Sequence, residues 1–210
     1  MRRLLVSLSF IIYHLSLSHA VAQDYFGGAQ WIGAITRQQA HIPEGRHYQG
    51  AVLKESKSLW AQADTLSRRS IILRRSFKPW KTVKHAELRI CGLGFYELTI
   101  NSHQVGASMF APLWSDYDKS MFFNVYDVTN SLQQEDNEFR VLLGNGFYNE
   151  QGGRYHKLRV SFGPPTLLFF LYVTYEDGLR ERLLSDERWQ WTESPITFNR
   201  VVLFSAASGR

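Results

Sequence analysis

Apolar and polar residues alternate along several short segments from Val83 onward. The clearest are Glu87–Cys91, Tyr96–Asn101 and Glu138–Leu143, whose apolar residues fall mainly on one face of an extended chain. Because successive side chains of a strand point to opposite faces, this pattern predicts strands with one buried face. Thr166–Tyr175 is almost continuously apolar. That is typical of a strand that is covered on both faces or lies in the core of a sandwich.

Turn residues separate these segments at nearly regular spacing. Asp177-Gly178 lies between two apolar runs and predicts a type I′ hairpin turn. Asn101-Ser102 separates two further strands. Gly92-Leu93-Gly94 lacks the third glycine and the following helix of a dinucleotide-binding loop, so it predicts a turn between strands. Many short strands joined by such turns predict an all-β fold, an antiparallel β-sandwich or jelly roll.

The N-terminal third of the chain is less regular. Ala29–Gly33 and Ile71–Phe77 have the composition of short strands. The polar stretch between them, Thr36–Ser70, has weak helical character near residues 56–66, and we interpret it as a loop or insertion.

The first 22 residues have the features of an export signal. Arg2 and Arg3 precede the apolar run Leu4–Leu17, and Ala20-Val21-Ala22 provides a small-x-small cleavage site. The apolar run is shorter than the roughly 20 residues needed to span a bilayer, and no later segment qualifies. We therefore expect a mature chain that begins at Gln23, is exported to the periplasm or the extracellular space, and has no membrane partner after cleavage.

Composition narrows the function classes. Aromatic residues make up 14% of the chain, which suits both β-structure and the flat platforms on which sugar rings stack. The formal net charge is +5, part of it in the signal, and no basic stripe or nucleic-acid motif accompanies it, so we expect no nucleic-acid partner. Cys91 is the only cysteine, and its place on an alternating run predicts a buried strand residue rather than a reactive thiol.

The sequence lacks the motifs of a self-sufficient catalytic site. The histidines of the mature chain lack metal-ligand spacing, and there is no Gly-x-Ser-x-Gly nucleophile elbow. Glycoside hydrolysis needs two carboxylates that face each other across a sugar. The available carboxylates lie beside turns or on alternating strands, where solvated or capping roles are expected. They include Asp116, Asp118, Asp127, Glu138 and Asp177.

A set of short motifs follows the order found in bacterial α-L-rhamnosidases of glycoside hydrolase family seventy-eight, and the chain resembles the N-terminal region of that family. The matching segments are Ala29–Gly33, Leu73–Phe77, Gly92–Leu98 with Ile100-Asn101, Pro112–Tyr117, Tyr126–Thr129, Leu143–Asn149, Asp177-Gly178, Ser185-Asp186, Trp189 and Ser194–Ile196. Each motif alone is weakly specific, but the ordered set covers most of residues 29–199. Ser102 stands where the family has glycine, which predicts a strained hairpin or a different turn.

The resemblance implies a β-sandwich of the galactose-binding-like type, acting as the N-terminal, non-catalytic domain of an exported α-L-rhamnosidase. On this basis we divide the chain into a signal peptide (1–22), N-terminal strands and an insertion (23–82), the rhamnosidase N-terminal β-sandwich (83–199) and a tail outside the family pattern (200–210). In the family, the catalytic carboxylates lie in a following (α/α)₆ barrel. The resemblance therefore implies that barrel as a partner, and it predicts no catalytic residue and no glycosidase activity in this chain alone.

A second interpretation is a stand-alone carbohydrate-binding module for rhamnose-containing glycans, since some relatives of this sandwich bind rhamnose, in some cases through calcium. The candidate carbohydrate-binding residues are the aromatic and polar loop residues Trp114, Asp116, Tyr117, Asn145, Tyr148 and Asn149. Asp116, Asn145 and Asn149 are also candidate calcium ligands, because calcium prefers carboxylate and amide oxygens. We expect no other cofactor.

Blander explanations compete with this site. Trp114 and Phe147 are more simply explained as core residues that anchor their loops, because aromatic side chains are usually buried. A third interpretation is a sandwich that serves only protein–protein contact, which exposed apolar strand faces in Leu167–Val173 would favour.

Overall fold

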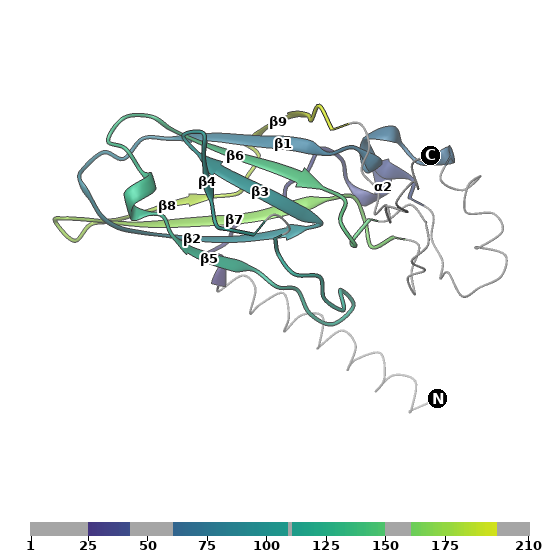
Figure 1. The fold of residues 1–210 in the computed structure, drawn as a ribbon, viewed down its shortest axis with the longest axis horizontal. Coiled ribbons are helices and arrows are strands. Elements are labelled where there is room, and N and C mark those ends of the chain that lie inside the picture. The colour runs from purple at the N-terminus through teal and green to yellow at the C-terminus, as the bar shows by residue number, and fades with distance from the viewer. Residues whose placement is uncertain (1–24, 43–60, 109–110, 150–160, 197–210) are drawn as a thin grey trace, which may run out of the picture.

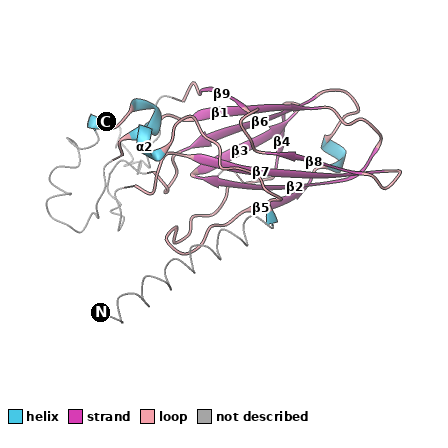
Figure 2. Ribbon diagram, turned by 180° about the vertical axis from the view of Figure 1, so that it is seen from behind, coloured by secondary structure: helices cyan, strands magenta, loops and turns pink. Residues whose placement is uncertain are grey.

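The computed structural model describes residues 25–42, 61–108, 111–149 and 161–196. Its strands are β1 (Ile71–Phe77), β2 (Val83–Leu93), β3 (Phe95–Ile100), β4 (His103–Val105), β5 (Asn124–Asp127), β6 (Asn137–Gly144), β7 (Thr166–Tyr175), β8 (Arg180–Leu184) and β9 (Gln190–Glu193), and its short helices are α2 (Arg37–Ala40), η1 (Thr65–Arg68) and η2 (Thr129–Ser131). Two antiparallel sheets pack face to face, in the orders β4-β3-β6-β1-β9 and β5-β2-β7-β8 (Figure 1). The short helices lie at the ends of the sandwich (Figure 2). The predicted all-β antiparallel sandwich is confirmed.

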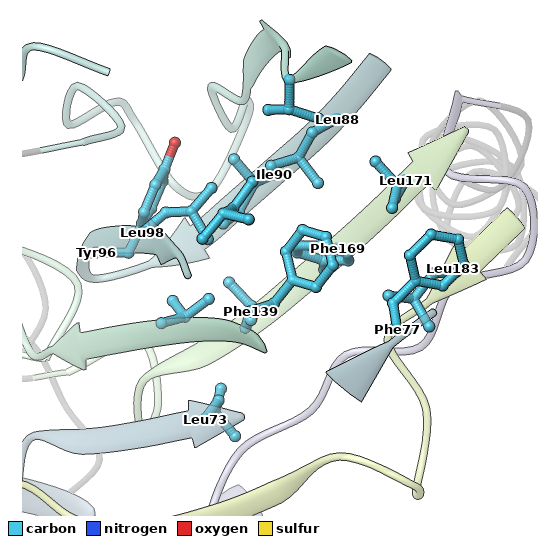
Figure 3. Packing of buried hydrophobic residues seen from close by; sticks show 14 of the residues in the cluster. Leu73, Phe77, Leu88, Ile90, Tyr96, Leu98, Phe139, Phe169, Leu171 and Leu183 are labelled. Atoms are coloured by element: carbon cyan, nitrogen blue, oxygen red, sulfur yellow. The ribbon is translucent and has the colours of Figure 1, made fainter. Parts of the chain in front are cut away.

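The core lies between the two sheets and is built from alternate strand residues. Tyr96, Leu98 and Ile100 of β3 are buried, and the residues between them are partly exposed. The ring of Phe139 on β6 contacts that of Phe169 on β7 across the sandwich, with centroids 5.3 Å apart (Figure 3). Burying an apolar side chain of this size stabilises the fold by about 1.5–3 kcal/mol, so the alternation is the main source of stability for the sandwich.

β7 is covered on both faces, as its unbroken apolar sequence predicts. One face contributes to the core between the sheets, while Leu168 and Phe170 on the other face pack with Phe26 and Cys91 in a second apolar cluster. Burial raises the pKa of the Cys91 thiol to about 12, as expected for an unreactive strand residue. Exposed apolar faces in Leu167–Val173 would favour the protein-contact interpretation, and β7 does not provide them.

The second cluster is closed by the N-terminal segment, defined here as Tyr25–Ile32. The backbone N–H of Gln30 donates to the carbonyl of Ser185 at 2.8 Å, and the Gln30 carbonyl accepts a hydrogen bond from the Ser185 hydroxyl at 2.7 Å. Ile32 forms an isolated antiparallel bridge with Leu167. The strand expected at Ala29–Gly33 is therefore wrong, because the segment bonds to two different elements of the sheet instead of running along one strand.

β1 belongs to the sandwich although it precedes the expected domain start at Val83. It pairs with β6 on one side and β9 on the other. The sandwich therefore includes Ile71–Phe77, and the expected boundary after residue 82 falls inside it. Within its described residues, the expected insertion contains α2 and η1. Residues 56–60 of the predicted helical region, the signal peptide and the 200–210 tail lie outside the described residues.

Within the part of the chain that the structure describes, no helix has the length and apolar character needed to cross a bilayer.

The β3–β4 hairpin accommodates serine where glycine is usual. Asn101 and Ser102 have φ angles of 52° and 67°, as both central residues of a type I′ turn require. The Asn101 side chain helps to fix this turn, because its amide donates to the side chain of Asn137 at 2.8 Å. Ser102 is exposed, and its side chain makes no hydrogen bond like that of Asn101 with the described residues to offset the left-handed conformation.

The β7–β8 hairpin differs from its prediction. At Asp177-Gly178 only Gly178 has a positive φ, of 83°, so the predicted type I′ turn is wrong. The N–H of Tyr175 instead pairs with the carbonyl of Leu179 around a three-residue loop, and the Asp177 side chain accepts a hydrogen bond from the Leu179 N–H at 3.0 Å. The Asp177 side chain caps this three-residue loop. An Asp-Gly dipeptide occurs in both kinds of turn, so the sequence alone does not tell them apart.

Replacing Ser102 by glycine should stabilise the domain. A left-handed conformation costs a residue with a Cβ about 1–2 kcal/mol, and the extra freedom of glycine in the unfolded chain offsets part of that gain. We expect Ser102→Gly to raise the free energy of unfolding by roughly 0.5–1 kcal/mol in urea titrations. Ser108, which is exposed and lacks a positive φ, is the matched control, and Ser108→Gly should give no gain. Equal effects at the two positions would contradict the strain at Ser102.

Candidate functional site

The candidate residues lie on two loops. The β5-entry loop, defined as Ala111–Phe123, leads into β5 and projects from the body of the sandwich (Figure 1). The glycine loop, defined as Gly144–Asn149, follows β6. The two loops lie close together because Ala111 bridges to Tyr96 of β3, the strand that pairs with β6.

Trp114 is exposed, with 64% of its surface accessible. One side of its ring rests against Phe147 of the glycine loop, with centroids 6.0 Å apart, and Phe147 in turn contacts Phe95 at 5.8 Å. The expected anchoring role is thus met by Phe147, which is half-buried, while most of the Trp114 ring remains available to a ligand or a partner.

Tyr117 and Tyr148 form a small aromatic cluster with Phe162. Tyr117 lies 5.1 Å from Tyr148 and 5.3 Å from Phe162, centroid to centroid. The Tyr148 hydroxyl donates to the Phe162 carbonyl at 3.2 Å. Burial raises the pKa of Tyr117 to about 12, so this phenol stays neutral at physiological pH. The cluster fixes the β5-entry loop against the glycine loop.

Asp116 organises the tip of the β5-entry loop. Its carboxylate accepts from the Lys119 ammonium at 2.8 Å, and this hydrogen bond lowers the pKa of Asp116. Its backbone carbonyl accepts from the N–H groups of Lys119 and Ser120. The carboxylate is exposed to solvent, so the turn-capping role expected for such residues is the one that the geometry supports.

Asn145 and Asn149 are buried rather than presented at the surface. The Asn149 amide donates to the carbonyl of Ser67 and, at 3.0 Å, to the side-chain oxygen of Asn145. Its own side-chain oxygen accepts from the Ser161 hydroxyl at 2.6 Å. The Asn145 amide donates to the carbonyl of Arg68 at 3.0 Å. These bonds tie the glycine loop to η1, and Ser67 and Ser161, which complete the network, carry no sequence signal that would have singled them out.

The six candidates therefore divide by exposure. Trp114 and the Asp116 carboxylate are exposed on one loop, Tyr117 and Tyr148 pack between the two loops, and Asn145 and Asn149 lie in a buried network. The side-chain oxygens of both asparagines already accept hydrogen bonds. Among the described residues, no group of three or more histidine, cysteine, aspartate or glutamate side chains could hold a metal ion. The calcium site at residues 116, 145 and 149 stays a prediction.

Similarity to known proteins agrees with the arrangement of the sheets. The sequence model of the "Alpha-L-rhamnosidase N-terminal domain" matches residues 81–204. The chain belongs to this family. The domain match begins after β1, although β1 lies inside its sheet between β6 and β9, and it extends through residue 204 into the segment that we expect to be a tail.

Related enzymes are much longer than this rhamnosidase N-terminal domain. An α-L-rhamnosidase of Formosa agariphila is 31% identical over 183 residues, which are 85% of this chain and 19% of the relative. One of Streptomyces avermitilis is 33% identical over 65% of this chain and 13% of its own length. The α-L-rhamnosidase structure from Aspergillus terreus has a TM-score of 0.57 at 35% identity over 60% of this chain and 15% of its own. The Streptomyces avermitilis structure, complexed with L-rhamnose, also gives 0.57, at 32% identity over 65% of this chain and 13% of its own. The chain thus spans about a fifth or less of these relatives.

Proposed function

We propose that the chain is the accessory N-terminal domain of an exported α-L-rhamnosidase, which supports the catalytic barrel and does not hydrolyse glycosides itself. The observation that carries this proposal is the family membership of a domain that makes up 19% or less of its enzyme relatives. A domain that makes up so small a part of an enzyme can stabilise the catalytic part by packing against it.

Two exposed carboxylates, Asp116 and Asp177, have an environment that does not suit a general acid. Asp116 is held by Lys119, and Asp177 is hydrogen-bonded to Lys81; in both cases the hydrogen bond from the lysine lowers the pKa of the carboxyl group. A general acid for glycoside cleavage needs the opposite shift, because it must keep its proton near neutral pH. These carboxylates are suited to fixing turns rather than to proton transfer.

The purified chain should therefore release no nitrophenol from an aryl α-L-rhamnoside above the rate of buffer. The measurement is absorbance over hours at high protein concentration, with a full-length α-L-rhamnosidase as the positive control. Hydrolysis that persists through purification and is abolished by Asp116→Asn or Asp177→Asn would show that the chain carries its own active site. Hydrolysis that these substitutions leave unchanged would point to a contaminant or to another carboxylate.

Weak binding of an L-rhamnose unit is the second candidate function, favoured by the exposed ring of Trp114. The 6-methyl group of the sugar offers an apolar edge to that ring, and Asp116 and Tyr117 lie close to it in the chain. A single monosaccharide has few atoms to contribute, so the dissociation constant should be on the order of millimolar to micromolar.

Calorimetric titration with L-rhamnose, with and without calcium, tests this candidate. Binding should be lost in Trp114→Ala and retained in Trp80→Ala, because Trp80 is similarly exposed, at 57%, but lies next to Tyr175 and the β7–β8 hairpin. Absence of heat in both conditions, from a protein shown to be folded, would leave only the accessory role. Heat that depends on calcium would support the ligand set at residues 116, 145 and 149.

A further inference from the structure

The β5-entry loop carries a group of large apolar side chains that the sandwich leaves exposed. We name this group the apolar ridge. It consists of Leu113, Trp114, Met121, Phe122 and Val125, the last of them on β5 itself. Leu113 is 73% exposed and Phe122 is 52% exposed, although both are residues that proteins normally bury. A concentration of such residues on one surface marks a contact site in soluble proteins.

The fold of the loop brings the two halves of the ridge together. The Ser115 hydroxyl donates to the Ser120 carbonyl at 2.6 Å and closes the base of the tip. Trp114 and Met121, which come directly before and after these two residues, are therefore close to each other. At the tip, Asp116 and Lys119 form an ion pair beside the exposed Asp118. The apolar ridge therefore lies beside a charged tip, in which Asp116 and Lys119 bind each other.

The ridge is attached to the sandwich on the side of β2. The ring of Phe123 lies 5.5 Å from that of Tyr25 and 5.4 Å from that of Phe26 in the N-terminal segment. The Phe122 carbonyl accepts a hydrogen bond from the Cys91 thiol at 3.2 Å. These contacts position the exposed Phe122 side chain through its neighbours. A partner would meet a surface that is already formed, which reduces the entropy cost of binding.

The chemistry of the ridge fits a protein partner better than a sugar. Leu113, Met121, Phe122 and Val125 carry no strong hydrogen-bonding side-chain groups, whereas a sugar site needs several convergent polar groups. In the curated relatives more than four-fifths of the polypeptide lies outside the part that matches this chain. A domain in the same polypeptide is present at an effective concentration in the millimolar range. It therefore binds the apolar ridge more readily than a separate protein at a lower concentration.

We infer that the apolar ridge is the surface on which the catalytic part of an α-L-rhamnosidase packs. This inference rests on the proposed accessory function and names the surface that performs it. In this arrangement Trp114 and Phe122 are buried between the two domains, and the tip at Asp116–Lys119 lies at the rim of the interface, where charged residues are ordinarily found.

The test uses the Streptomyces avermitilis α-L-rhamnosidase from which the segment matching this chain has been deleted, shown by circular dichroism to be folded. Purified wild-type chain should bind it in calorimetry and raise its melting temperature. Leu113→Ser and Phe122→Ser should each weaken binding by about tenfold or more, as expected for central interface residues. Leu179→Ser is the matched control, because Leu179 is 46% exposed in the β7–β8 hairpin, away from the ridge, and it should bind like wild type. Each variant must first show an unchanged unfolding midpoint.

Three results would overturn the inference, and they are distinguishable. Wild-type affinity in both ridge variants would exclude the ridge while leaving the accessory function intact. Failure of the wild-type chain to bind the folded deletion enzyme would refute the accessory function together with the ridge. A dimer of the chain in sedimentation velocity that Phe122→Ser dissociates would assign the ridge to a second copy instead of the enzyme.

Discussion

Gly94→Ala is expected to destabilise the domain by roughly 4 kcal/mol or more, enough to leave most molecules unfolded in a domain of marginal stability. Gly94 joins β2 of one sheet to β3 of the other with a φ of 121°, a conformation that residues with a Cβ rarely adopt. A Cβ at this position would lie 2.0 Å from the backbone carbonyl oxygen of Gly144. The two backbones would have to separate, and the pairing of Phe95 with Gly144 would be lost.

The matched control for this prediction is Gly178→Ala in the β7–β8 hairpin. Gly178 also has a positive φ, of 83°, but a Cβ there would have nothing within 4 Å. Its replacement carries only the conformational cost, about 1–2 kcal/mol. Urea unfolding of the two variants separates the steric term from the conformational one. If Gly94→Ala were no more harmful than Gly178→Ala, the close approach of the two sheets at this corner would not exist.

Asn149→Asp is expected to lower the free energy of unfolding by about 3–5 kcal/mol at neutral pH, because it removes the donor of two buried hydrogen bonds and places a charge in their stead. The introduced carboxylate would face the Ser67 carbonyl and the Asn145 side-chain oxygen, both of which are acceptors. A charge that the folded site disfavours raises the carboxyl pKa in the folded state above its value of about 3.9 in the unfolded chain. The loss of stability should therefore be smallest in acid and should grow as the pH rises through and above about 3.9.

Asn130→Asp is the control for this experiment, because Asn130 is exposed in η2 and should tolerate the change within about 0.5 kcal/mol. Calcium provides a second comparison. If residues 116, 145 and 149 formed a calcium site, an added negative charge there would strengthen it, and millimolar calcium would restore stability to Asn149→Asp. Rescue by calcium would support the predicted site, whereas stability that calcium does not change would leave the hydrogen-bond network as the role of Asn149.

The strands that the sequence predicted best are those whose pattern has a local cause. In β3 and β6 one face is buried and the other is solvated, so apolar and polar residues alternate along the sequence. β1 was recognised as a strand, but its place between β6 and β9 follows from pairing partners that lie far along the chain, such as Asn137 opposite Phe77. The expected boundary after residue 82 separates β1 from these partners, since the composition around Val83 does not reveal which strands β1 pairs with.

The loop residues show a similar limit. Asn145 and Asn149 read as surface ligands because polar residues beside glycine usually face solvent, yet their partners Arg68 and Ser67 come from η1, 77 and 82 positions earlier. The anchoring role expected of Trp114 and Phe147 is met by Phe147, whereas Trp114 rests against it and stays exposed. The exposure of Leu113 and Phe122 cannot be predicted from the sequence, because an apolar residue in a loop gives no sign of whether the rest of the fold covers it.

The contact between Gln30 and Ser185 has a consequence for how the chain is made. The two residues are 155 positions apart. Ribosomes add about 5–20 residues per second, so roughly 8–30 s separate the synthesis of the N-terminal segment from that of its docking site. During this interval Phe26 has no Phe170 to pack against. Once β7 is made, its outer apolar face can bind the N-terminal segment of its own chain or that of another chain. Phe26 of the N-terminal segment thus stays uncovered until β7 and Ser185 have been made, and in this period binding by a chaperone would have the greatest effect on yield.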